Sequence, residues 1–200
     1  MRAISIWSPI LLAGLLCAAL FPAGPTAAGS AAVAAYVFHR SWSAAGDQLR
    51  FPRGLAVAPD GDLYIANGDL HRIVYVRRGD RTFSVLASFG REPGEFDSPG
   101  DIALDTAGNL YITDTGNHRV QVLSAAGQFI RQWGGLTNTG EAGKFKYPQG
   151  IVVDPAGFVY VVDTYNHRIQ KFTLDGQYRS QWGSQGSGAG QFSYPEGLAR

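Results

Sequence analysis

Asp114-Thr115-Gly116-Asn117-His118-Arg119 is the stretch that decides the fold, because the sequence repeats it. It returns as Asp163-Thr164-Tyr165-Asn166-His167-Arg168 and, more loosely, as Asn67-Gly68-Asp69-Leu70-His71-Arg72. A proline opens each unit, and these prolines recur every 47 to 49 residues, at Pro52, Pro99, Pro148 and Pro195. A period in this range is typical of a repeat architecture. The repeats run from about 49 to 90, 96 to 134 and 145 to 183, and another starts at 192–200.

Each unit is predicted to form four strands. In the second unit they are expected at 102–104, 110–113, 120–123 and before Trp133, and in the third at 151–153, 159–162, 169–172 and before Trp182. The first strands are wholly apolar, which favours burial on both faces, and the second are rich in β-branched and aromatic residues. The third strands alternate apolar and polar residues, which predicts one wetter face. Gly108 and Gly157 suit the tight turn between the first two strands.

Four antiparallel strands in a repeat of this length predict an all-β fold, a β-propeller whose blades are arranged radially. The units resemble NHL repeats across residues 36–200, most strongly in the second and third units. The first unit departs from the pattern, with Asn67 for the aspartate, Leu70 for the asparagine and Phe89 for the tryptophan.

The resemblance implies a ring of six blades, whereas this sequence holds about three full blades plus partial first and last ones. The strand expected at 36–42 would belong to the partial first blade. Either the sequence is part of a longer propeller, or two copies complete one ring as a homodimer.

Residues 1–31 resemble a secretory signal peptide. Arg2 precedes an apolar run at 10–21 and a small-residue stretch at 26–31. We therefore expect a secreted or periplasmic protein without a membrane association after signal removal. The apolar run is shorter than the ~20 residues that span a bilayer, which disfavours an uncleaved anchor. Because Cys17 is the only cysteine, the mature chain would have neither disulfides nor thiolate metal sites.

The charge balance disfavours a nucleic-acid ligand. The chain has 17 basic and 16 acidic residues, whereas a protein that binds a duplex needs an excess of lysine and arginine to neutralise phosphates. We expect no nucleic acid among its partners.

The repeated motif residues are expected to serve mainly the fold. A carboxylate at Asp114 can reach back across the tight turn to the guanidinium of Arg119. Trp133 and Trp182 are predicted to be buried between neighbouring blades, with Phe89 in the equivalent place of the first blade. Some histidines and arginines of the motif are also candidate binding residues: His71, His118, Arg119, His167 and Arg168. Three histidines around a channel mouth are in addition a conceivable zinc site, although repetition alone explains their spacing.

Binding is expected where the repeats differ. After each opening proline the sequence varies, with Arg53, Gln149 and Glu196 in three units and with Asp101 replacing the expected glycine in the second unit. The family geometry places these residues around the mouth of the central channel, and loops on a rigid scaffold are the usual place for recognition. Asp101 is the first choice for a specific contact.

These observations favour a secreted binding or scaffold module that recognises a peptide, a glycan or a protein partner, without a cofactor. The alternative is a metal-dependent propeller enzyme similar to the peptide-amidating lyases or to lactonases, holding zinc or calcium. The resemblance to those lyases is weakened because this chain has no histidine in its Pro-x-Gly segments, where the lyases have a metal ligand.

Overall fold

The computed structural model describes residues 49–80 and 82–199, which fall within one compact unit. The signal peptide expected at 1–31 and the strand expected at 36–42 lie outside the described residues.

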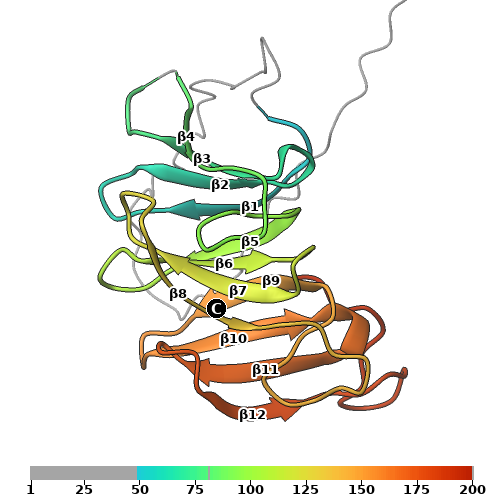
Figure 1. Ribbon diagram of the computed structural model, residues 1–200. Coiled ribbons are helices and arrows are strands. Elements are labelled where there is room, and N and C mark those ends of the chain that lie inside the picture. The colour runs from blue at the N-terminus through green and yellow to red at the C-terminus, as the bar shows by residue number, and fades with distance from the viewer. Residues whose placement is uncertain (1–48, 81, 200) are drawn as a thin grey trace, which may run out of the picture. The chain divides into compact units, whose positions relative to one another are not determined.

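Twelve strands form three four-stranded antiparallel sheets, which are three propeller blades (Figure 1). Blade 1 consists of β1 (Pro52–Val57), β2 (Leu63–Asn67), β3 (Arg72–Val76) and β4 (Ser84–Ala87). Blade 2 consists of β5 (Pro99–Leu104), β6 (Leu110–Asp114), β7 (Arg119–Leu123) and β8 (Phe129–Gly134). Blade 3 consists of β9 (Pro148–Val153), β10 (Phe158–Asp163), β11 (Arg168–Thr173) and β12 (Tyr178–Trp182).

Strand order within each blade follows the chain, so each blade is a meander of hairpins. The innermost strands β1, β5 and β9 pack beside one another. The short 3-10 turns η1 (Gly68–Leu70) and η2 (Thr164–Asn166) lie between the second and third strands of blades 1 and 3. No helix in the described part of the chain is long and apolar enough to cross a bilayer.

The turn between the first two strands needs a left-handed backbone, as the sequence predicts. Gly108 and Gly157 have φ of 82° and 84°, a conformation that glycine adopts without a steric penalty. The strands on either side then pair in register, with Leu104 opposite Leu110 in blade 2 and Val153 opposite Val159 in blade 3.

Two apolar layers hold the blades face to face. The layer between blades 1 and 2 includes Ile73, Phe96 and Leu123, and the layer between blades 2 and 3 includes Phe145 and Phe172, all fully buried. Burial of a side chain of this size stabilises the fold by about 1.5 to 3 kcal/mol. Each blade is therefore stabilised mainly by its neighbours, as in other repeat architectures.

The prediction of a wetter face on the third strands was wrong. All five residues of β7 are buried, and the polar side chains Gln121 and Gln170 are fully buried. Alternation signals exposure only when one face of a sheet meets water. Here blades pack on both faces, and the glutamines find hydrogen-bond partners inside the protein.

The prediction that the tryptophans are buried between blades holds in part for Trp133, which is half-buried at the blade junction, and not for Trp182. Trp133 packs between Tyr111 of its own blade and Phe172 of blade 3, with ring centroids 6.3 and 5.7 Å away. Trp182 makes the matching contact with Tyr160, at 6.0 Å. It remains 43% exposed, because no further complete blade covers it within the described residues.

Phe89 does not take the tryptophan's place in blade 1. Gly127 lies against Leu86 as Gly176 lies against Trp133, so Leu86 is the equivalent residue. Phe89 is 65% exposed and contacts the ring of His71 instead. Phe89 instead takes the place of Leu136, since both residues make the same bridge to the phenylalanine that follows, Phe96 or Phe145.

Candidate functional site

The repeated motif forms a buried ion pair in blades 2 and 3. Arg119 Nε donates to Asp114 Oδ2 at 2.7 Å, and Arg168 Nε donates to Asp163 Oδ2 at the same distance. Neither carboxylate has any exposed surface. The predicted link from aspartate to arginine is confirmed, and its burial makes it a strong, geometrically fixed interaction.

Each arginine also donates hydrogen bonds to the loop that precedes its blade. Arg168 Nη2 donates to the carbonyls of Glu141 and Lys144, and Nη1 donates to the Gly140 carbonyl and the Gln181 amide oxygen. Together with the bond to Asp163, these contacts engage all five N–H groups of the guanidinium. Arg168 therefore has no donor left for a ligand.

A buried glutamine completes the same network. Gln121 Nε2 donates to Asp114 Oδ2 and to the carbonyl of Glu95, while its Oε1 accepts from the Gly94 amide. Gln170 repeats these contacts in blade 3. Burial raises the pKa of Asp114, although the hydrogen bonds from Asp97, Arg119 and Asn117 oppose that shift.

The motif histidines join each blade to the next stretch of chain. The backbone N–H of Tyr147 donates to His118 Nδ1, and that of Tyr194 donates to His167 Nδ1, both at 3.1 Å. Both histidines have a left-handed backbone, with φ of 57° and 54°. Burial lowers the pKa of His118, which favours the neutral ring that this acceptor role requires.

His71 occupies the same place in blade 1. Its Nδ1 lies 3.0 Å from the N–H of Ser98 and 2.9 Å from the carboxylate of Asp97. The three histidines thus lie at successive blade junctions. Among the described residues, no three histidine, cysteine or acidic side chains come close enough together to hold a metal ion.

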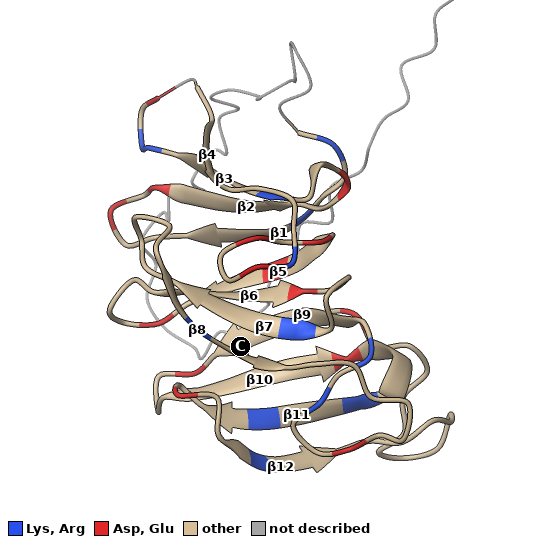
Figure 2. Ribbon diagram, in the orientation of Figure 1, with Lys and Arg blue, Asp and Glu red and all other residues tan. Residues whose placement is uncertain are grey.

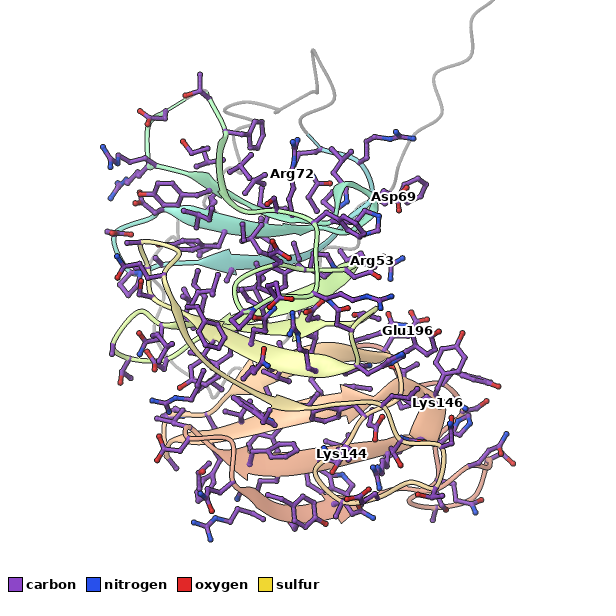
Figure 3. All side chains as sticks on the ribbon, viewed as in Figure 1. Arg53, Asp69, Arg72, Lys144, Lys146 and Glu196 are labelled. Carbon is purple, nitrogen blue, oxygen red and sulfur yellow. The ribbon has the colours of Figure 1, made fainter. Side chains whose placement is uncertain are left out.

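The residues that differ between the repeats near each opening proline lie around one hollow. Arg53, Asp101, Gln149 and Glu196 line one hollow of about 740 Å³, together with Tyr165 and the glycines at 100, 150 and 197. Figure 3 shows Arg53 and Glu196 at the same edge of the stacked sheets, where the innermost strands begin. The sequence comparison of repeats therefore identified the residues that share this mouth, and their part in binding stays a prediction.

Asp101 is held between the innermost strands of blades 2 and 3. Its Oδ2 accepts the N–H of Ile151 in β9 at 3.1 Å, and its Oδ1 accepts the N–H of Ile102. Burial raises its pKa above the ordinary value of 3.8, against the effect of these two bonds. A Cβ at Gly54 would lie 2.4 Å from the Asp101 Cα, so blade 1 needs glycine there.

Charges at the mouth are mixed in sign. Arg53 and Glu196 are exposed, and Asp101, which lines the same hollow, is partly buried. Figure 2 shows basic and acidic segments interspersed over all three blades rather than gathered by sign. The mouth can therefore offer both a cation and a carboxylate to one ligand.

Below the mouth, the channel wall is apolar. Leu55 and Val57 of β1 are 57% and 58% exposed, and they line a second hollow of about 290 Å³ with residues of β5 and β9. Exposed apolar side chains on an innermost strand are expected where the strand faces a channel instead of another sheet.

Sequence reasoning missed two sets of residues. Tyr165 lines the mouth but stands at the place that Gly116 takes in blade 2, so comparing the repeats residue by residue could have found it. Gln121 and Gln170 recur at one position of the repeat. That recurrence, rather than their polarity, was the signal for a buried role.

The model of the NHL repeat family matches the chain at residues 49–74, 96–123 and 145–172. Each match covers the first two strands of one blade and all or most of the third. The expected resemblance is thereby confirmed for all three units, including the divergent first one.

Two curated relatives share this region. The chain is 32% identical over 90 residues to NHL repeat-containing protein 3 of Homo sapiens, covering 43% of this chain and 26% of that protein. It is 31% identical over 94 residues to peptidyl-glycine alpha-amidating monooxygenase A of Xenopus laevis, covering 44% of this chain and 10% of that protein. The chain thus matches about a quarter of the first relative's length and a tenth of the second's.

Solved structures agree with the fold. Virginiamycin B lyase from Staphylococcus aureus superposes with a TM-score of 0.55 at 18% identity, over 73% of this chain and 44% of that one. A chain of a nidogen/laminin complex superposes with a TM-score of 0.51 at 26% identity, over 65% of this chain and 48% of that one. The chain thus matches the NHL repeat at three positions, and each matched segment lies in one four-stranded blade of a β-propeller.

Proposed function

We propose that this protein is a secreted, non-enzymatic binding propeller whose channel mouth recognises a peptide or protein partner. The observation that carries the proposal is the convergence of Arg53, Asp101, Gln149 and Glu196 on one hollow. These residues lie in four different units of the chain and are the ones that the repetition does not explain.

The repeated residues are engaged elsewhere, which supports this division of roles. The guanidinium of Arg168 is fully hydrogen-bonded, and Nδ1 of His118 and of His167 accepts a backbone N–H group. A ligand would have to break those bonds to reach the Arg168 guanidinium or either Nδ1 atom. The mouth residues Arg53 and Glu196 are exposed and free of that constraint.

The comparisons favour a protein or peptide over other ligands. One neighbour in fold, at 26% identity, comes from a nidogen/laminin complex. A hollow of about 740 Å³ with mixed charge suits side chains of a peptide segment. Secretion forms part of the proposal and rests on the sequence of residues 1–31.

Binding to peptide and glycan arrays tests the proposal. The triple variant Arg53→Ala, Gln149→Ala, Glu196→Ala should lose at least tenfold in affinity for whatever peptide the natural chain selects, with an unchanged melting temperature. Thr106→Ala, at an exposed turn at the opposite end of the blades, is the matched control and should bind as the natural chain does. Selection of a peptide that binds both variants equally would refute the mouth as the site.

A metal-dependent enzyme remains the second candidate, favoured by the 31% identity to an amidating monooxygenase. Elemental analysis of the purified protein distinguishes the two. Zinc or calcium at one equivalent per chain, retained after dialysis against a chelator, would favour the enzyme over the binding module.

A further inference from the structure

Three exposed tyrosines form a continuous row, which we call the tyrosine strip: Tyr147 just before β9, Tyr165 in η2 and Tyr194 in the segment after β12. The rings of Tyr147 and Tyr165 lie 5.0 Å apart, and those of Tyr165 and Tyr194 lie 5.3 Å apart. Each ring is exposed, by 41%, 48% and 51% in chain order. Three large aromatic side chains in mutual contact at the surface form a patch of the kind that marks a binding site.

The strip is rigid. Tyr147 and Tyr194 each have a left-handed backbone, with φ of 50° and 47°, and each donates its N–H to a motif histidine. The same histidines, His118 and His167, pack edge-on against these two rings at 4.4 and 4.5 Å. Pre-organised aromatic rings lose little entropy when a ligand binds.

The fold does not require tyrosine at these places. Ser98 occupies the position of Tyr147 in blade 2, with the same left-handed backbone at φ of 47°, and Gly116 occupies the position of Tyr165. Blade 2 forms the same four-stranded sheet without these rings. The strip is therefore another feature in which the repeats differ, and Tyr165 also lines the mouth beside Gln149 and Glu196.

The ring angles indicate what the strip can hold. Neighbouring rings are tilted by 53° and 74°, so they form slots between them rather than one flat surface. A flat surface suits stacking on the face of a sugar ring, whereas slots between aromatic rings suit the prolines of an extended peptide. Two steps of about 5 Å also approximate one turn of a polyproline helix, roughly 9 Å.

The carboxylate of Glu196 adds a negative charge near the tyrosine strip. Glu196 follows Tyr194 by two residues and is exposed, and it takes part in none of the ion pairs formed between described residues. In Figure 3 it lies at the same edge as Lys146, which precedes Tyr147. A carboxylate beside an aromatic row favours a basic residue next to the prolines.

We propose that the tyrosine strip, with Glu196 at its end, binds an extended proline-containing segment that carries an arginine or lysine. This inference rests on the proposed function, because it specifies the ligand class of the same mouth. The prolines occupy the slots of the strip, and the basic side chain reaches the carboxylate of Glu196.

Saturation-transfer NMR on the full chain tests the proposal with a synthetic hexaproline peptide ending in arginine. At millimolar peptide, saturation should reach the proline ring protons. The same peptide ending in glutamate should bind at least fivefold more weakly. An alternating glycine–serine peptide ending in arginine should show no transfer.

The variants copy residues that blade 2 already accepts. Tyr165→Gly and Tyr147→Ser should each weaken binding of the proline–arginine peptide at least tenfold without a change in melting temperature. Tyr178→Ser, at a similarly exposed ring on β12, is the control and should leave binding unchanged. Glu196→Gln should abolish the preference for arginine over glutamate.

Failure of this inference and failure of the proposed function give different results. No transfer to the prolines, or transfer that Tyr165→Gly leaves intact, would overturn the strip as a proline site. If an array-selected peptide still depended on Arg53, Gln149 and Glu196, the mouth would stand as a binding site without the strip. A glycan that required the tyrosines would overturn the peptide assignment.

Discussion

At the scale of single residues, the repeated motif holds the blades together through buried polar contacts. Asp163 accepts from Arg168, Asn166 and Gln170 and from the Lys146 amide, and it has no exposed surface. A buried charge without its partner is strongly destabilising. The recurrence of aspartate and arginine in the sequence therefore reports on stability, although the same residue types also occur in binding sites.

Removing one member of the buried pair should destabilise the protein severely. Asp163→Ala leaves the Arg168 guanidinium buried without its carboxylate, and we expect a loss of about 3 to 5 kcal/mol in the free energy of unfolding. Urea denaturation measures it. Asp175→Ala is the matched control, because Asp175 pairs with Arg131 but is 75% exposed, and should cost under about 1 kcal/mol. Equal losses would show that burial does not set the strength of these pairs.

Asp101 should make stability depend on pH in an unusual direction. Burial raises its pKa in the folded state above 3.8, so the folded protein binds this proton more tightly than the unfolded chain does. The contribution of this bound proton to the free energy of unfolding is fully present below pH 3.8. It is lost as the pH rises through the raised pKa of Asp101.

Asp101→Asn removes this titration while its amide oxygen can still accept the N–H of Ile151. Its NH2 group would face the N–H of Ile102, which adds a cost that does not depend on pH. The stability of the variant relative to the natural chain should therefore rise from pH 3.5 to pH 7. Thermal melts of both proteins across this range provide the comparison. A difference that stays constant with pH would show that Asp101 does not titrate with a raised pKa.

At the scale of elements, the positions of the strands and turns could be predicted from the sequence, but the burial of the third strands could not. The second strands, β6 and β10, were evident from β-branched and aromatic residues, and the turn glycines from their spacing. The third strands were misjudged, because polar residues at alternate positions normally face water. That rule fails where other blades pack on both faces of a sheet. In the sequence, only the recurrence of Gln121 and Gln170 at one repeat position indicates that these side chains are buried.

The two tryptophans test how far packing between blades stabilises the array. Trp133 lies between two blades, whereas Trp182 contacts Tyr160 of its own blade and remains 43% exposed. Trp133→Ala should cost about 3 kcal/mol, since it opens a cavity at a blade junction, and Trp182→Ala should cost under about 1 kcal/mol. Calorimetric melts measure both. A larger loss for Trp182→Ala would mean that its exposed face is covered in solution.

At the scale of the whole molecule, a repeated scaffold brings unrepeated residues together. Arg53 and Glu196 are far apart in the sequence yet line one hollow, because the innermost strand of every unit begins at the same edge. Comparing the units could predict which residues share that mouth. It could not predict the tyrosine strip, since the contacts among Tyr147, Tyr165 and Tyr194 depend on how adjacent turns lie in space.

The separation of scaffold residues from binding residues requires that the motif histidines are engaged in joining the blades. Native-state hydrogen exchange of the Tyr147 and Tyr194 amides tests it directly, because these groups lie in loops but donate to His118 and His167. We expect both amides to exchange as slowly as those of the central strands, and we expect His118→Ala to speed exchange at Tyr147 while Tyr194 stays protected. Exchange of both amides at the rate of an open loop in the natural chain would contradict it.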